Sequence, residues 1–200
     1  MRKNSSEFVT SFVSEAGTFR TNKDYFAYAE MDDLACWIAA DGIDSDEAKN
    51  SAEIAAQSIF SELLEHPVLS RRKLKKYLKN AHKALKAESR SVRLKVSMVI
   101  MVTDYSKMIW ASTGNARFYH FRNRRLDFKS RDQSIAQLMM ESSRISEDEL
   151  GENVERNNLT NYLGTNKRLK IRVSKKFYLN DGDAVLLCTA GFWENINNVK

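Results

Sequence analysis

The sequence contains few of the residues that interrupt or cross-link a chain: one proline, seven glycines and two cysteines among 200 residues. Cys36 and Cys188 lie in separate apolar runs without CxxC spacing, which indicates buried thiols of a reducing compartment and not a disulfide or a zinc pair. No apolar run approaches the roughly 18 residues of a membrane span, and the N-terminus lacks the apolar core of a signal peptide. We therefore expect a cytoplasmic protein with no membrane partner.

Length and composition indicate one globular domain. The chain is 42% hydrophobic and 29% charged, which is enough apolar material for one sizeable core. No internal repeat, linker or low-complexity tract divides it. We expect a single domain over residues 1–200.

The net charge of +6 is concentrated in the stretch RRKLKKYLKNAHKALK at residues 71–86. Its apolar residues recur at helical spacing, so the lysines fall on the opposite face of the predicted helix. The interpretation we favour is the solvated face of an amphipathic helix, because no interleaved aromatic residues or base-reading motif accompany the charge. The alternative is a module that binds nucleic acid or an acidic partner, although nucleic acid is not the partner we expect.

The order of the remaining patterns predicts the fold class. Ser70 is placed to cap the basic helix, and residues 44–46 are placed to cap the helix before it. In the strand predicted at 92–104, alternation of apolar and polar residues indicates one buried and one wet face. Hairpin spacing, without βαβ spacing, favours an α+β layered sandwich of antiparallel sheet covered by helices. Strands are predicted at 7–17, 24–33, 34–41, 92–104, 107–113, 116–123, 169–179 and 184–191, and helices at 46–66, 71–86, 132–143 and 146–154.

Three short motifs lie near the ends of predicted strands: RTNKDYFAYAE at 20–30, ADGIDSDEAKNSA at 40–52 and LLCTAGFWE at 186–194. Supporting motifs lie between them, namely STGNARFYHFRNRRL, RDQSIAQLMMESSRIS, ERNNLTNYLG and LNDGDAVLLCT. In this order they resemble the bacterial-type members of the protein phosphatase type 2C, or PPM, family of metal-dependent serine/threonine phosphatases. The resemblance implies a layered α-β-β-α sandwich, with two mainly antiparallel sheets flanked by helices.

The resemblance also implies a centre for Mn²⁺ or Mg²⁺. A pair of such ions activates water and neutralises phosphoryl oxygens, and both metals prefer oxygen ligands. Arg20 stands where the family has its phosphate-binding arginine, whose planar fork suits a phosphate. Asp24 stands at a metal-binding glutamate, Asp41 at the aspartate that bridges the metals, and Gly42 at a carbonyl ligand.

Several positions depart from the family pattern. Ala190 stands where the family places a metal-ligating aspartate, and Asn115 where many members have an aspartate for a third metal. Tyr25 replaces an aspartate, and Asp44-Ser45 replaces a Gly-Gly pair, which makes a different loop geometry expected there. The last family ligand, in an Asp-Asn turn before the final strand, has no counterpart, so the domain is expected to lack that strand.

These departures lead to three hypotheses about function. The first is an inactive or severely weakened pseudophosphatase that binds phosphorylated proteins, with a serine/threonine kinase as a candidate partner and reduced metal occupancy, down to one ion. The second is a residually active, Mn²⁺- or Mg²⁺-dependent hydrolase of phosphoserine and phosphothreonine. The third is the basic-helix binding module described above.

Overall fold

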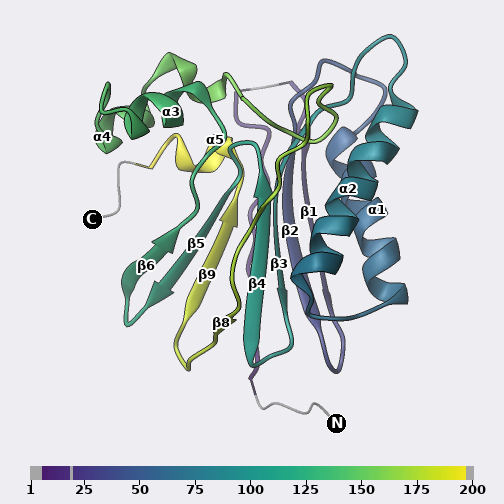
Figure 1. The fold of residues 1–200 in the computed structure, drawn as a ribbon, viewed down its shortest axis with the longest axis vertical. Helices are drawn as coiled ribbons and strands as arrows, with labels where there is room; N and C mark the ends of the chain where they lie inside the picture. Colours follow the sequence, from purple (N-terminus) through teal and green to yellow (C-terminus); the bar gives the residue numbers. More distant parts are fainter. Residues whose placement is uncertain (1–5, 19, 197–200) are drawn as a thin grey trace.

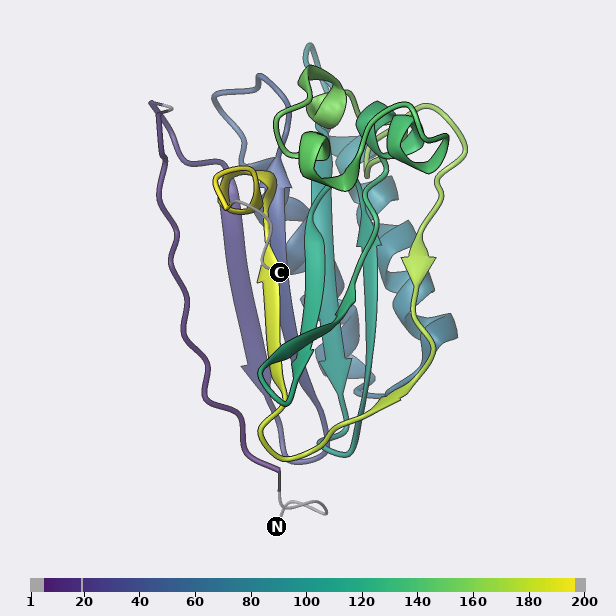
Figure 2. The same ribbon diagram turned by 90° about the vertical axis from the view of Figure 1, so that its left-hand side faces the viewer.

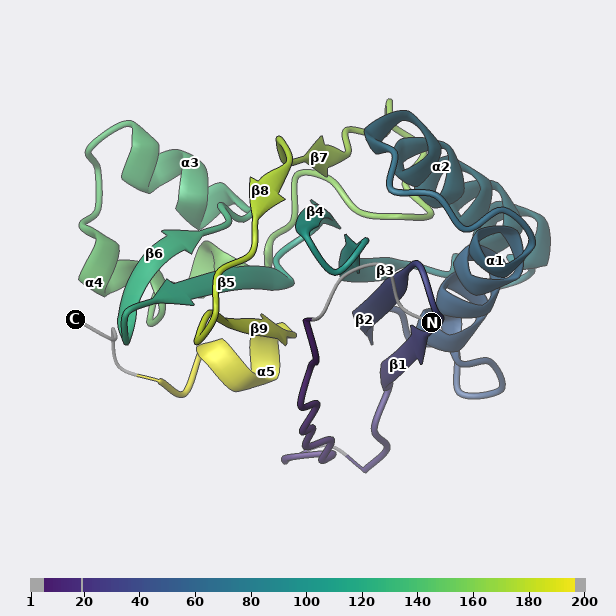
Figure 3. The same ribbon diagram turned by 90° about the horizontal axis from the view of Figure 1, so that it is seen from below.

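The computed structural model describes residues 6–18 and 20–196. In this part of the chain, two antiparallel sheets face each other, and helices cover the larger sheet on its outer side (Figures 1 and 3). The expected α+β class is confirmed, and the helices of the fourth layer gather at one end of the smaller sheet (Figure 1).

The larger sheet has six strands in the described residues, in the order β1-β2-β3-β4-β7, with β8 also paired to β4. The register of β1 on β2 pairs Asp24 with Asp41, so the start of one strand lies beside the end of the next. The strands are β1 (Asp24–Glu30), β2 (Ala35–Gly42), β3 (Val96–Thr103), β4 (Lys107–Thr113), β7 (Arg172–Val173) and β8 (Phe177–Tyr178).

The smaller sheet has the order β6-β5-β9 among the described residues. It consists of β5 (Arg117–Arg122), β6 (Arg125–Lys129) and β9 (Ala184–Cys188). The sequence did not predict β6, which follows a two-residue turn at Asn123 and Arg124, both with positive φ. The turn lacks the glycine that usually signals such a hairpin.

Two long helices cover the larger sheet: α1 (Ser51–Glu65) and α2 (Arg71–Glu88). Ser70 caps α2 as expected, accepting a hydrogen bond from the Lys73 amide. The predicted start of α1 is wrong, because Asn50 is its N-cap and Asp44 and Asp46 hold the preceding loop instead. At the end of the smaller sheet lie α3 (Ile135–Glu141), α4 (Glu147–Leu150), the 3₁₀ turn η1 (Val154–Asn157) and α5 (Ala190–Trp193).

Two apolar layers hold these parts together. One lies between the larger sheet and the helices α1 and α2, and includes Ile38, Ile59 and Leu78. The other lies between the two sheets, where Trp110 stacks on Phe118 with ring centroids 5.4 Å apart. Every residue of β3 is buried, because the helices α1 and α2 cover one face of the sheet and the smaller sheet covers the other. The predicted wet face is therefore wrong within β3, where Ser97 is buried, although Arg93 before the strand is exposed.

Two other predicted strands are also wrong in part. Residues 6–16 are extended, but they form no strand within the part of the chain that is described, because no neighbouring backbone provides ladder hydrogen bonds. The single strand predicted at 169–179 is two short strands, β7 and β8. They are separated after Ser174, whose amide still donates to the Trp110 carbonyl while its hydroxyl accepts from the Trp110 amide.

Candidate functional site

Two carboxylates face each other at one end of the larger sheet. Asp24 and Asp41 are direct partners in the antiparallel ladder, which places their Cβ atoms about 4.5–5.5 Å apart on one face. Strand alternation puts Asp24 on the same side as Phe26, and Asp41 on the same side as Ala39 and Trp37. Since those three side chains contribute to the core between the sheets, the acid pair lies at the end of the inter-sheet space.

Burial and like charge disfavour the ionised forms of the two aspartates. Burial, followed by the charges of Asp24, Glu194 and Asp44, raises the pKa of Asp41 to about 7, against the opposing effect of Lys23. Burial also raises the pKa of Asp24, while a hydrogen bond from Thr189 lowers it. Like charges at this distance favour either a shared proton or a bound cation.

The junction between β9 and α5 lies against the acid pair, through Thr189. Thr189 is the N-cap residue of α5, yet its hydroxyl does not cap the helix. It donates to Asp24 Oδ2 over 2.7 Å instead. Ala190, the next residue, is 8% exposed and packs with Ala136, Leu150 and Trp193. The residue that follows Thr189 therefore has a methyl side chain, which carries no ligand atom.

Glu194 is a charged residue of the site that the motif comparison did not select. It lies four residues after Ala190, just past the end of α5, and its charge raises the pKa of Asp41. Glu194 Oε2 lies 3.2 Å from Arg156 Nε, and Glu194 Oε1 is buried without a hydrogen-bond partner among the described residues. The i, i+4 spacing from position 190 was the available signal, since it places two side chains on one helical face.

Gly42 and Asn115 are held tightly in place. A Cβ at Gly42 would lie 2.7 Å from Ser51 Oγ, so a side chain there would have to displace that hydroxyl. Asn115 is 2% exposed, and its main-chain oxygen accepts from Trp193 Nε1 over 2.8 Å. Its side-chain nitrogen donates to Asn157 Oδ1 over 3.2 Å, and its Oδ1 has no partner in the described part of the chain.

The loop after Asp41 is fixed by its own hydrogen bonds. Asp44, which replaces a family glycine, accepts from Lys23 Nζ and from the Lys95 amide, each over 2.9 Å. Although burial alone would raise its pKa, these bonds and one with Ser51 lower it. The Asp44 carboxylate therefore fixes the loop after Asp41, where the resemblance predicted only that the geometry would differ from the family's.

Arg20 is exposed at the bend before β1. No hydrogen bond or ion pair joins it to Asp24 or Asp41 within the described residues. The structure therefore places Arg20 near the start of the strand that carries Asp24, without fixing its guanidinium in the site.

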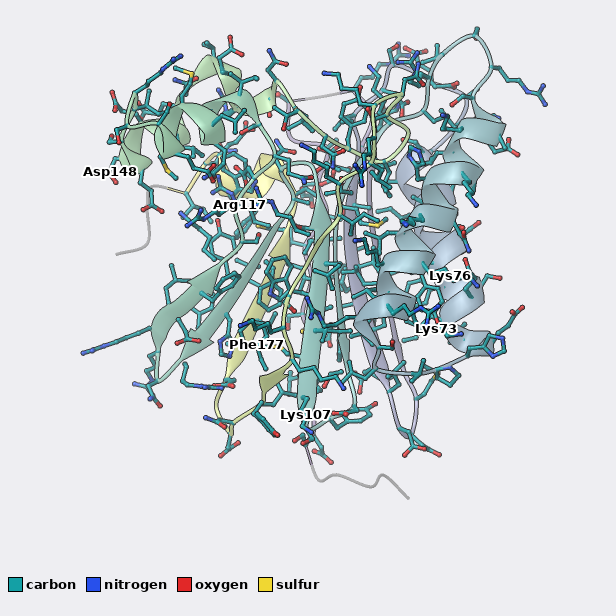
Figure 4. All side chains as sticks on the ribbon, in the orientation of Figure 1. Lys73, Lys76, Lys107, Arg117, Asp148 and Phe177 are labelled. Atoms are coloured by element: carbon teal, nitrogen blue, oxygen red, sulfur yellow. The ribbon has the colours of Figure 1, made fainter. Side chains whose placement is uncertain are left out.

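Arg117 is a second arginine at the same end of the molecule. Arg117 is 7% exposed and makes two hydrogen bonds to Asp132, of 2.9 and 2.7 Å. Its guanidinium lies 3.4 Å from the ring centroid of Trp193 in α5. Figure 4 labels it at the helical end of the smaller sheet. The residue links β5 to α5, and therefore positions the turn that holds Ala190 and Glu194.

The acid pair offers oxygen ligands at one end of the larger sheet. Asp24 and Asp41 converge, and the carbonyl of Gly42 follows directly, which is an oxygen set suited to Mn²⁺ or Mg²⁺. Within residues 6–18 and 20–196, however, no group of three or more His, Cys, Asp or Glu side chains could hold a metal. In the same residues, no helix is long and apolar enough to cross a membrane.

No protein-family model and no curated protein matches the chain. Solved structures match it closely in fold. A serine/threonine phosphatase of S. agalactiae has a TM-score of 0.75 at 16% identity, covering 88% of this chain and 76% of its own. The PPM Ser-Thr phosphatase MsPP of Mycobacterium smegmatis, solved with cacodylate, has a TM-score of 0.68 at 17% identity, covering 84% and 72%. The catalytic domain of the phosphatase PstP, solved with two manganese ions, has a TM-score of 0.69 at 16% identity, covering 93% and 79%.

These likenesses define the class of structure. The chain has the fold of the PPM-type serine/threonine phosphatases. A shared fold at this identity does not assign an activity, because function depends on the residues of the site.

Proposed function

We propose that this chain is a PPM-type phosphatase-like domain that binds one divalent cation at Asp24 and Asp41, and that its hydrolase activity is absent or severely weakened. The observation that carries the proposal is the junction of β9 and α5. There Thr189 reaches Asp24, while the adjacent Ala190 contributes no carboxylate. The site accordingly has the acid pair that attracts a cation but lacks the further carboxylate that a second cation would need.

Asp24, Asp41 and the Gly42 carbonyl would hold the ion, which we expect to be Mn²⁺ or Mg²⁺. Bound there, a divalent ion neutralises phosphoryl oxygens and acidifies water. Arg20 would bind the phosphate of the ligand, and its exposed position leaves it free to approach from the start of β1. Thr189 would keep Asp24 oriented.

The domain would then recognise phosphorylated proteins and release them unchanged, or hydrolyse them slowly. A serine/threonine kinase is a candidate partner. The second candidate, a residually active hydrolase of phosphoserine and phosphothreonine, is favoured by one observation. Glu194 adds a third negative charge that acts on Asp41, which increases the attraction for a cation.

Manganese-dependent hydrolysis of p-nitrophenyl phosphate separates the two candidates. We expect no turnover above background from the native chain and measurable turnover from Ala190→Asp, because the substitution restores a carboxylate beside the acid pair. Ala190→Asp combined with Asp41→Asn is the matched control and should be inactive. Native turnover that disappears on Asp41→Asn would contradict the pseudophosphatase and support the residual hydrolase.

A further inference from the structure

A lysine lies directly beside the residues of the proposed cation site. Lys23 precedes Asp24 in the chain, and its carbonyl oxygen accepts from the Gly42 amide over 3.1 Å. A Cβ at Gly42 would lie 3.4 Å from Lys23 Cβ, so the two residues are neighbours across the end of the sheet. Figure 2 shows this end of the molecule, where the start of β1 (purple), the end of β2 (blue) and α5 (yellow) lie together. A positively charged residue therefore belongs to the end of the sheet where we expect a cation to bind.

Three oxygens of the loop after Gly42 bind the ammonium group of Lys23. Lys23 Nζ donates to Asp44 O and to Asp44 Oδ1, each over 2.9 Å, and to Asp46 O over 2.5 Å. An ammonium group has three donors, so these acceptors use all of them. The Asp44 side chain is fully buried, and that of Lys23 is 22% exposed. The loop therefore holds the ammonium group in one place.

The Asp44 carboxylate is a further acid near the site, and Lys23 balances its charge. Asp44 Oδ2 also accepts from the Lys95 amide over 2.9 Å, and Asp44 Oδ1 accepts from the Asp46 amide over 3.1 Å. Hydrogen bonds to a carboxylate favour its charged form, so the charge of Asp44 does not depend on Lys23 alone. Loss of Lys23 would therefore leave an uncompensated negative charge two residues after Gly42.

The two charges of this pair act on Asp41 in opposite directions. Burial has the largest effect on the pKa of Asp41; the charge of Asp44 also raises this pKa, and that of Lys23 lowers it. A divalent cation bound at Asp41 would be attracted by Asp44 and repelled by Lys23. The pair as a whole is close to neutral toward such an ion, whereas either residue alone is not.

We infer that Lys23 determines how strongly the site binds a divalent cation, an inference that rests on the proposed function. The ammonium group cancels the charge of Asp44 and holds that carboxylate in the loop, so that the acid pair alone attracts the ion. Lys23 acts through Asp44 as a built-in counter-ion and is not a catalytic residue. This arrangement limits the affinity of the site and withholds from it an additional carboxylate.

Calorimetric titration with Mn²⁺ at pH 7.5 tests the inference with two single variants and their combination. Lys23→Met replaces the charged side chain by an apolar one of similar length, and should bind Mn²⁺ roughly three- to tenfold more tightly, because the charge of Asp44 is then uncompensated. Asp44→Asn leaves Lys23 uncompensated, and should bind roughly three- to tenfold more weakly. The double variant has neither charge, and should match the native affinity within about twofold.

Lys49→Met is the matched control for the loss of one positive charge. Lys49 Nζ forms a solvent-exposed ion pair with Glu88 at 2.7 Å, and Lys49 is not among the charges that act on Asp41. This variant should bind Mn²⁺ as the native chain does. Thermal unfolding without metal checks that each variant is folded. If Lys23→Met does not fold, the comparison of Asp44→Asn with the double variant still tests the inference.

The direction of the change separates this role from a structural one. Loss of a contact that only held the loop in shape would weaken binding or leave it unchanged. Unchanged or weaker binding by Lys23→Met would therefore overturn the inference and leave the proposed function intact, as would a double variant that binds as weakly as Asp44→Asn. Absence of Mn²⁺ binding in both the native chain and Lys23→Met would overturn the proposed function, and the inference with it.

Discussion

At the scale of single residues, the acid pair controls how stability depends on pH. The pKa of Asp41 in the folded protein is about 7, whereas an ordinary aspartate has a pKa of about 3.9. Between these values the folded protein holds a proton that the unfolded chain has released. The contribution of Asp41 to stability is therefore fully present below about pH 4 and is lost as the pH rises through about 7.

Asp41→Asn should remove this dependence. We expect the variant to be more stable than the native chain by about 2–4 kcal/mol at pH 8 and about equally stable at pH 4. Urea unfolding at a series of pH values, without added metal, measures the difference. Asp33→Asn, at an exposed position in the turn between β1 and β2, is the control and should follow the native curve. A parallel decline in the native chain and Asp41→Asn would refute this assignment of the pH dependence.

At the scale of elements, Arg117 of β5 makes a buried ion pair with Asp132 and stacks on Trp193 of α5. Arg117→Met should destabilise the protein by about 3–5 kcal/mol, because it leaves the buried Asp132 carboxylate without its partner. The double variant Arg117→Met with Asp132→Leu should recover part of that loss. Arg125→Met, at an exposed position of β6, should have little effect. Denaturant unfolding gives all three values, and a double variant less stable than the single one would contradict the argument.

The basic helix α2 has a charge pattern that costs stability. Lys75, Lys79 and Lys83 follow one another at i, i+4, a spacing at which like charges repel. Figure 4 labels Lys73 and Lys76 on the same helix. Lys79→Glu should raise stability by about 0.5–1 kcal/mol, since two repulsive pairs become attractive. Thermal unfolding at low salt checks this, with Lys86→Glu near the end of the helix as the comparison.

The same helix allows a test of the nucleic-acid alternative. We expect duplex DNA to bind weakly and without a steep salt dependence, as a solvated helix face would. Neutralising Lys75, Lys76 and Lys79 should then change little. Tight, salt-sensitive binding that this triple change abolishes would favour the binding-module hypothesis, and fluorescence anisotropy at two salt concentrations measures it.

The sequence was informative where local pattern decides structure. The strand at 34–41, the cap at Ser70 and the hairpin that joins the strands predicted at 92–104 and 107–113 follow from an apolar run, capping and a turn, and the structure has them. The sequence was misleading where contacts with distant parts of the chain decide the structure. Residues 7–17 have a strand pattern but no partner backbone. In β3, Ser97 is buried because its hydroxyl accepts from the Asn115 and Ala116 amides, and no periodicity reveals that contact.

In the site, too, the sequence revealed the residues of local motifs but not those brought in by long-range packing. Asp24 and Asp41 were selected by motif, and the ladder register brings them together. Glu194, Arg156 and Arg117 were not selected, because their contacts depend on how α5 and η1 pack across the end of the smaller sheet. The roles of Arg20, Asp24, Asp41 and Gly42, and those of Asn115 and Ala190, stay predictions. So does the absence of a final strand.

At the scale of the whole molecule, a PPM-type fold places an acid pair at one end of the larger sheet. A fold that keeps its layers while its site changes can retain binding and lose turnover, since the two depend on different residues. Cation binding to the folded state alone would also raise the melting temperature. The number of cations that the native chain binds therefore tests the proposed function.

Calorimetric titration of the native chain with Mn²⁺ at pH 7.5 measures that number directly. We predict one bound ion for the native chain, none for Asp41→Asn, and an unchanged single site for the control Asp33→Asn. Two ions bound by the native chain, or one ion bound equally well by Asp41→Asn, would contradict the account.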